Sequence, residues 1–137
     1  MNISDVMTRD VEIARPTDTI QAVAQKMASG DFGFMPVCDG RKIQGVITDR
    51  DLAVRAVAEG KSCDTPVSEI MSEALEWRYD DEPAKDVLAC MAEKQIRRLP
   101  IVNRDKELVG VVSLGDLALS GKDQAAGDAL ESISRKG

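Results

Sequence analysis

The sequence predicts an α/β fold of the α+β kind, built from two pseudo-symmetric β-α-β-β-α repeats that pack together through their sheets. The first observation is an internal duplication, because residues 5–37 recur at 69–101 with a constant offset of 64. After a one-residue insertion, GVITDRDL at 45–52 recurs as GVVSLGDL at 110–117. The second observation is that strand and helix patterns follow in the same order in both copies. Each copy of such a repeat packs against its neighbour, so the duplication predicts two equivalent clefts.

Apolar runs and turn residues define the elements of the first copy. Strands are predicted at 11–14, 34–38 and 43–48, with Asp39-Gly40 as the turn between the last two. Apolar residues at 20, 23, 24 and 27 have helical spacing, with Thr17 or Asp18 as the N-cap and Gly30 as the stop. A second helix is predicted over 49–59, closed by Gly60.

The second copy repeats this plan after a short capped helix at 65–69. Strands are predicted at 76–79, 98–102 and 108–113, and helices at 83–93 and 115–119. The predicted organisation is a first repeat at 1–60, a linker at 61–64, a second repeat at 65–120, and a tail at 121–137 that is a short helix or disordered. Because about 60 residues bury a core only marginally, the halves are expected to share one core within a single module at 1–120.

Composition excludes several functional classes. The 137 residues carry 18 basic and 24 acidic side chains, for a net charge of −6, which disfavours nucleic acid as a partner. The chain shows neither an apolar run near the roughly 20 residues that span a bilayer nor a secretory signal, so a cytoplasmic protein without a membrane partner is expected. Histidine is absent, which removes the commonest general base and zinc ligand. We therefore predict no enzyme, no catalytic residue and no metal ligand.

Cysteine, methionine and aromatic residues have structural interpretations. The chain has three cysteines, Cys38, Cys63 and Cys90, which lie far apart in the sequence. The odd number and the wide spacing favour reduced, partly buried thiols. A regulatory or intermolecular disulfide through Cys63 is the alternative. The methionines at 7, 27, 35, 71 and 91 are expected to fill the core. Trp77 and Tyr79 share one face of a predicted strand and point either to the core or to a partner.

A hydroxyl residue followed by a carboxylate three positions later occurs at equivalent places in both copies, as Thr48-x-x-Asp51 and Ser113-x-x-Asp116. The structural interpretation is a capping box at a helix start. Because helix starts attract anions and a carboxylate can accept both hydroxyls of a ribose, the repetition also favours a ligand site.

These motifs, with DVMT at 5–8 and EIMS at 69–72 and with MPV at 35–37 and LPI at 99–101, resemble a tandem CBS domain pair, or Bateman module. The resemblance covers residues 3–119, and the chain is similar to the small stand-alone bacterial proteins of the hypoxic-response family. It implies a regulatory module that binds AMP, ADP, ATP or a related adenosyl ligand in clefts between the copies. It further implies a homodimer that signals to an unknown effector protein. No cofactor is required, and Mg²⁺ would enter only with ATP.

The resemblance also implies which residues bind the nucleotide in the second-copy cleft. Asp116 would hold the ribose hydroxyls, Ser113 the ribose or α-phosphate, and Arg98 a phosphate. The adenine wall would come from Phe32 and Gly33 of the other copy and from backbone near Thr8 and Val11. An alternative is that Arg97 and Arg98 are simply surface residues beside a strand.

In the first-copy cleft, Asp51 and Thr48 would take the same roles. Phe34 and Gly33 stand where the second copy has Arg98 and Arg97, so Arg50 is the remaining candidate for a phosphate. The Asp116 cleft is therefore predicted to bind better, or alone. The alternative function is a structural dimerisation module whose clefts are vestigial and hold no nucleotide.

Overall fold

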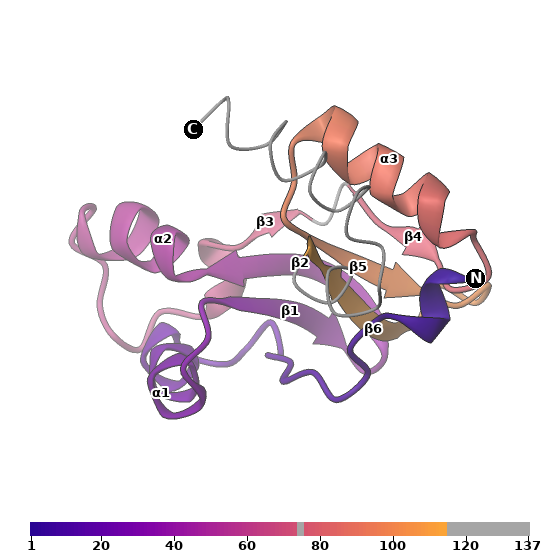
Figure 1. The fold of residues 1–137 in the computed structure, drawn as a ribbon. Helices are drawn as coiled ribbons and strands as arrows, with labels where there is room; N and C mark the ends of the chain where they lie inside the picture. The colour runs from indigo at the N-terminus through magenta and orange to yellow at the C-terminus, as the bar shows by residue number, and fades with distance from the viewer. Residues whose placement is uncertain (74–75, 115–137) are drawn as a thin grey trace. The chain divides into compact units, whose positions relative to one another are not determined.

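The structure is a computed structural model that describes residues 1–73 and 76–114, and it divides into two compact units (Figure 1). Of the described residues, 12–73 form unit A, and 1–11 with 76–114 form unit B. Unit boundaries therefore differ from those of the sequence repeats, because the N-terminal segment belongs with the second repeat. The predicted helix at 115–119 and the tail lie outside the described residues.

Unit A contains a three-stranded antiparallel sheet in the order β1-β2-β3. Its elements are α1 (Ile20–Gly30), β1 (Phe34–Asp39), β2 (Lys42–Thr48), α2 (Asp49–Asp51), a π-helix (Leu52–Val57), a 3₁₀ turn (Val67–Glu69) and β3 (Ser72–Glu73). A tight turn between β1 and β2 is present, but it lies one residue later than predicted, at Gly40-Arg41, because Asp39 is the last residue of β1 and pairs with Lys42. Gly40 has a positive φ of 62°, which glycine adopts without strain.

The predicted ends of α1 shift by one or two residues. Thr19 is the N-cap, because its Oγ1 accepts the Ala22 N–H at 3.1 Å. Asp18 is not the cap, because its carboxylate accepts the Arg15 N–H at 2.9 Å instead. Past Gly30 the chain leaves the helix at Asp31, whose left-handed conformation (φ 55°) takes the place expected for glycine.

Two strand predictions in unit A are wrong. The expected strand at 11–14 is a single bridge between Ala14 and Val37. Ala14 bonds to the backbone of Pro36 and Cys38, whereas the Val11 N–H donates to the nearby Arg9 carbonyl and not to the sheet. Conversely, β3 pairs with β2 where no strand was expected. Gly45 allows this pairing, since an added Cβ would lie 2.5 Å from the Ser72 carbonyl oxygen.

The helix predicted over 49–59 is not a regular α-helix. After one α turn it widens into the π-helix, in which the Ala58 N–H donates to the Ala53 carbonyl at 2.9 Å. This arrangement keeps Leu52 and Ala56 against the core of unit A. Val54 and Val57 remain exposed, at 49% and 77%.

Unit B contains the sheet β4-β5-β6, with β4 parallel to β5 and β5 antiparallel to β6. The elements are a 3₁₀ turn (Ile3–Asp5), β4 (Arg78–Tyr79), α3 (Ala84–Lys94), β5 (Arg98–Val102) and β6 (Leu108–Ser113). The last two strands have the predicted bounds, whereas β4 is shorter than the predicted 76–79 because only Arg78 and Tyr79 pair with β5. The N-terminal segment joins this unit through a bridge between Thr8 and Val111.

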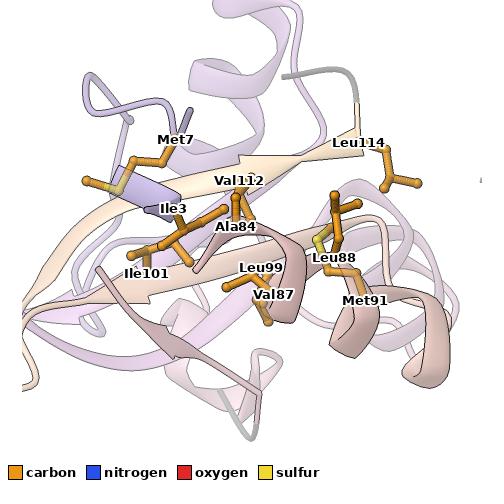
Figure 2. Close-up of a cluster of buried hydrophobic side chains, with 10 residues drawn as sticks. All are labelled: Ile3, Met7, Ala84, Val87, Leu88, Met91, Leu99, Ile101, Val112 and Leu114. Carbon is orange, nitrogen blue, oxygen red and sulfur yellow. The ribbon is translucent and has the colours of Figure 1, made fainter. Parts of the chain in front are cut away.

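Each unit has its own cluster of buried side chains among the described residues, and the single core shared by both halves stays a prediction. In unit B, α3 packs against the sheet and the N-terminal segment, as Figure 2 shows. The buried members are Ile3, Met7, Ala84, Val87, Leu88, Met91, Leu99, Ile101, Val112 and Leu114. In unit A, α1 packs on β1 and β2 through a second cluster, and the 3₁₀ turn at 67–69 adds to it.

The five methionines at 7, 27, 35, 71 and 91 lie in these clusters or pack against them, which confirms their structural role. The thiols of Cys38 and Cys90 are buried, that of Cys63 is exposed, and all are free in the described part of the chain.

Two aromatic residues, Trp77 just before β4 and Tyr79 within it, are half-buried and lie outside both buried clusters. Trp77 and Tyr79 make an edge-to-face contact with ring centroids 5.1 Å apart. Arg104 stacks on the Tyr79 ring at 3.9 Å and pairs with Asp81 at 2.8 Å. Neither ring is a member of the buried clusters, and contact of these rings with a partner stays a prediction.

Candidate functional site

Unit A places Thr48 and Asp51 in a reciprocal capping box at the end of β2. The Asp51 N–H donates to Thr48 Oγ1 at 3.1 Å, and the Thr48 N–H donates to Asp51 Oδ2 at 3.0 Å. The structural interpretation of the motif is therefore confirmed. The second oxygen, Oδ1, lies 3.8 Å from Arg55 Nε, and the Asp51 side chain is 16% exposed. This oxygen takes no part in the capping box and is the one that Arg55 approaches.

The loop before β1 lies against this helix start. The Gly33 carbonyl accepts the Asp49 N–H at 3.0 Å, and the next residue, Phe34, pairs with Thr48 across the sheet. A Cβ on Gly33 would lie only 2.5 Å from Asp49 Oδ2. Unit A thus brings the loop at 33–34 and the helix start at 48–51 together.

Phe32 and Arg50, also predicted to bind ligand, have less constrained settings. The Phe32 ring packs against Gly30 of α1 and lines an open hollow with Glu12 and helix residues. The hollow is completed by Ala22, Gln25, Lys26 and Ser29. Arg50 is exposed, and its backbone N–H donates to Asp49 Oδ1 at 2.9 Å.

Unit B brings together three of the residues predicted for the second-copy cleft. Arg98 pairs with Ser113 at the ends of β5 and β6. Thr8 is held beside β6 by two backbone hydrogen bonds to Val111, of 2.9 and 3.0 Å. Because Val111 and Ser113 are two residues apart on one strand, they share a face of the sheet. Threonine, serine and arginine therefore gather at one edge of unit B.

The other predicted residues of that cleft are distributed differently. Val11 is half-buried and lies three residues beyond Thr8 in the same segment. Asp116 lies outside the described residues. Phe32 and Gly33 belong to unit A, where Gly33 contacts the helix start of its own repeat.

The positive charge predicted for unit B is present and accessible. Arg97 and Arg98 are both exposed, as the surface interpretation of these residues also required. At the equivalent strand end, unit A presents the carboxylates of Asp49 and Asp51. Sequence reasoning missed Asp49, although the signal was available: Gly33 and Asp49 stand where the second repeat has Arg97 and Leu114.

Two negative findings concern the described residues only. In 1–73 and 76–114, no three His, Cys, Asp or Glu side chains gather as a metal site would require. Within the same ranges, no helix has the length and apolar character needed to cross a membrane.

A duplicated α+β repeat with a hydroxyl and a carboxylate at each strand end defines a tandem module of two pseudo-equivalent domains. The family model of the CBS domain matches at residues 3–57 and again at 67–121, and the chain belongs to the CBS-domain family. Its relatives include the CBS domain-containing protein YhcV of Bacillus subtilis, 41% identical over 136 residues, covering 98% of this chain and 96% of YhcV. Hypoxic response protein 1 of Mycobacterium tuberculosis is 30% identical over 116 residues, covering 83% of this chain and 80% of that protein.

Solved structures show the same fold. Hypoxic Response Protein I, crystallised with two coordinated zinc ions, is 29% identical with a TM-score of 0.78, covering 87% of this chain and 98% of that one. CBSX2 in complex with AMP is 20% identical with a TM-score of 0.78, and the match covers 90% of this chain and 97% of the CBSX2 chain. The CBS domain pair of protein MJ0100 was crystallised in complex with 5′-methylthioadenosine and S-adenosyl-L-methionine. It is 24% identical with a TM-score of 0.75, and the match covers 88% of this chain and 99% of the MJ0100 chain.

Proposed function

We propose that this protein is a regulatory module that senses an adenosine-containing nucleotide. The observation that carries the proposal is the group formed by Thr8, Arg98 and Ser113 at one edge of unit B. An exposed guanidinium beside a hydroxyl suits a phosphate, because the planar fork donates two parallel hydrogen bonds. Asp116, three residues after Ser113, would accept the ribose hydroxyls.

The bound ligands of two neighbours support this assignment. CBSX2 was crystallised with AMP, and the MJ0100 domain pair with 5′-methylthioadenosine and S-adenosylmethionine. All three ligands share an adenosine group and differ at the 5′ position. The common part of the ligand is what the repeated hydroxyl and carboxylate would recognise, and ATP would bring its own Mg²⁺.

The output of the module would pass through a homodimer to a separate effector protein. Val54 and Val57 on the π-helix of unit A are exposed apolar side chains, and such residues cover one another at protein interfaces. A ligand would shift the dimer only by binding its two states unequally. Val57→Asp should convert a dimer to a monomer in analytical ultracentrifugation, whereas Val57→Ala should leave it intact.

Titration calorimetry with AMP tests the nucleotide proposal. Arg98→Ala should weaken AMP binding about ten- to hundredfold, the value of charge-assisted hydrogen bonds. Arg104→Ala is the matched control, because Arg104 is an exposed arginine of the same unit that pairs with Asp81. If both variants bind AMP as the wild type does, Arg98 is only a surface residue.

A purely structural dimerisation module is the second candidate, and the lack of a basic residue at Phe34 favours it. Under this alternative the dimer would persist with no adenosine ligand bound. Neither candidate assigns a catalytic residue.

A further inference from the structure

The solvent-facing side of α1 in unit A carries an open hollow. Its volume is about 480 Å³, within the range of roughly 300–1,000 Å³ that small-molecule sites occupy. Four of its residues have spacings that place them on one face of the helix. The lining residues are Glu12, Ala22, Gln25, Lys26, Ser29, Gly30 and Phe32. Of these, only Phe32 is also predicted for a nucleotide site, and neither residue of the capping box lines the hollow.

Gly30 and Phe32 form the end of the hollow where α1 stops. The Phe32 N–H donates to the Met27 carbonyl at 3.2 Å, which turns the chain back against the last helical turn. A Cβ on Gly30 would lie only 2.6 Å from Phe32 Cδ1. Glycine at this position therefore allows the ring to lie across the helix end, where it forms an apolar wall.

The equivalent place in unit B is occupied by an ion pair. At the offset of 64 residues, Glu12 and Gly30 of unit A correspond to Glu76 and Lys94 of unit B. Lys94 Nζ lies 3.2 Å from Glu76 Oε1. Unit A keeps the glutamate, but glycine stands where unit B has the lysine. The carboxylate of Glu12 therefore lacks the ammonium that its counterpart has.

Glu12 and Lys26 are the charged residues that line the hollow, and both are exposed. Within residues 1–73 and 76–114, neither has an ion-pair partner, and the two do not pair with each other. The hollow thus presents a carboxylate, an ammonium and an aromatic ring, and the two charges sum to zero. The C-terminal end of α1 at Gly30 adds the negative end of the helix dipole, which favours a ligand ammonium there.

We propose that this hollow binds a free amino acid with an apolar side chain. The ligand ammonium takes the place that Lys94 Nζ has in unit B and pairs with Glu12. The ligand carboxylate pairs with Lys26, and the ligand side chain packs on the Phe32 ring. A simple amine or a simple carboxylic acid satisfies only one of the two charges. The inference is independent of nucleotide sensing, because Arg98 and Ser113 take no part in it.

Amide NMR titration of the full chain with phenylalanine, at low salt, tests the proposal. The signals of Gly30 and Phe32 should shift and reach saturation. N-acetylphenylalanine lacks the ammonium and phenylalanine amide lacks the carboxylate. Each should bind about two- to fivefold more weakly than phenylalanine, which is the contribution of an exposed ion pair. Equal binding of the three probes, or shifts that do not saturate, would overturn the proposal.

Two charge variants assign the roles of the residues. Glu12→Gln should remove the preference over N-acetylphenylalanine and keep the preference over phenylalanine amide, and Lys26→Gln should do the reverse. Glu59→Gln and Lys61→Gln are matched controls, because both residues are exposed charges of unit A outside the hollow. Both preferences should survive in the controls. Their survival in Glu12→Gln and Lys26→Gln as well would contradict the assignment.

Copying residues of unit B into the hollow supplies a further test. Gly30→Lys with Phe32→Ile places an ammonium near Glu12 and removes the aromatic wall, so phenylalanine binding should be lost. A folded double variant that binds phenylalanine as the wild type does would refute the proposal, and if the variant does not fold, the two charge variants decide. AMP titration of the wild type separates this result from the nucleotide proposal, because either ligand can fail to bind without the other.

Discussion

Gly110 allows the N-terminal segment to lie against β6, and its replacement by alanine should detach that segment. An added Cβ would lie 2.7 Å from Met7 Sδ and 2.8 Å from the Thr8 carbonyl oxygen. The methionine can move, but the carbonyl belongs to the backbone that forms two hydrogen bonds with Val111. Gly45 has the same role in unit A, against Met71 and Ser72.

The cost of Gly110→Ala follows from these contacts. Overpacking costs roughly 1–3 kcal/mol, and weakening two hydrogen bonds adds about 0.5–1.5 kcal/mol each. Alanine also lowers the conformational entropy of the unfolded chain relative to glycine, which stabilises the folded protein by about 0.4–1 kcal/mol. We expect a loss of about 1–6 kcal/mol, measured as a lower midpoint in urea unfolding.

The AMP affinity of Gly110→Ala should fall together with its stability, because Thr8 moves away from Ser113. Gly40→Ala is the control, since nothing lies within 4 Å of its added Cβ and only the positive φ of 62° is strained. The reasoning is refuted if Gly110→Ala unfolds at the wild-type urea concentration and binds AMP normally.

Three further predictions concern stability and reactivity. Thr48→Ala should cost about 1 kcal/mol in urea unfolding through loss of the cap, and Thr48→Ser should restore it; equal losses would contradict the capping role. Leu99→Ala, at a side chain with no exposed surface, should cost about 2–5 kcal/mol by the same assay, and a loss below about 1 kcal/mol would be inconsistent with a packed core. Burial raises the pKa of Cys38 from 9.0 to about 11, so its contribution is fully present below pH 9 and is lost as pH rises through 11. Stability of the wild type should therefore fall more than that of Cys38→Ala over this range, and parallel pH profiles would count against the raised pKa.

The repeat made most of the architecture predictable from sequence. The bounds of β5 and β6 follow from uniform apolar runs that end at a turn or a charged residue, and tertiary contacts did not alter them. The π-helix could not be predicted, because α and π spacing place Leu52 and Ala56 on similar faces over so short a segment. Likewise β3 depends on Gly45, whose role appears only when a neighbouring backbone approaches it.

The residue types of the candidate site could be predicted from the sequence, but which of these residues lie together in the structure could not. The capping motif and its duplication identified Thr48, Asp51 and Ser113 directly. The assignment of segment 1–11 to unit B is a property of long-range pairing, which no local pattern near Thr8 reveals. The contact of Asp49 with Gly33 was also hidden, because a glycine in a loop carries no charge signal of its own.

A thermal-shift panel of AMP, ADP, ATP, NADH and S-adenosylmethionine, on the wild type and Asp116→Ala, tests the central claim most directly. A ligand at about 100 times its dissociation constant stabilises a protein by roughly 2.7 kcal/mol, which corresponds to several degrees here. The account predicts such a shift for a phosphate-bearing adenosine ligand in the wild type and its loss in Asp116→Ala. Flat curves for every ligand, from a protein that unfolds cooperatively, would contradict nucleotide sensing and favour a structural module.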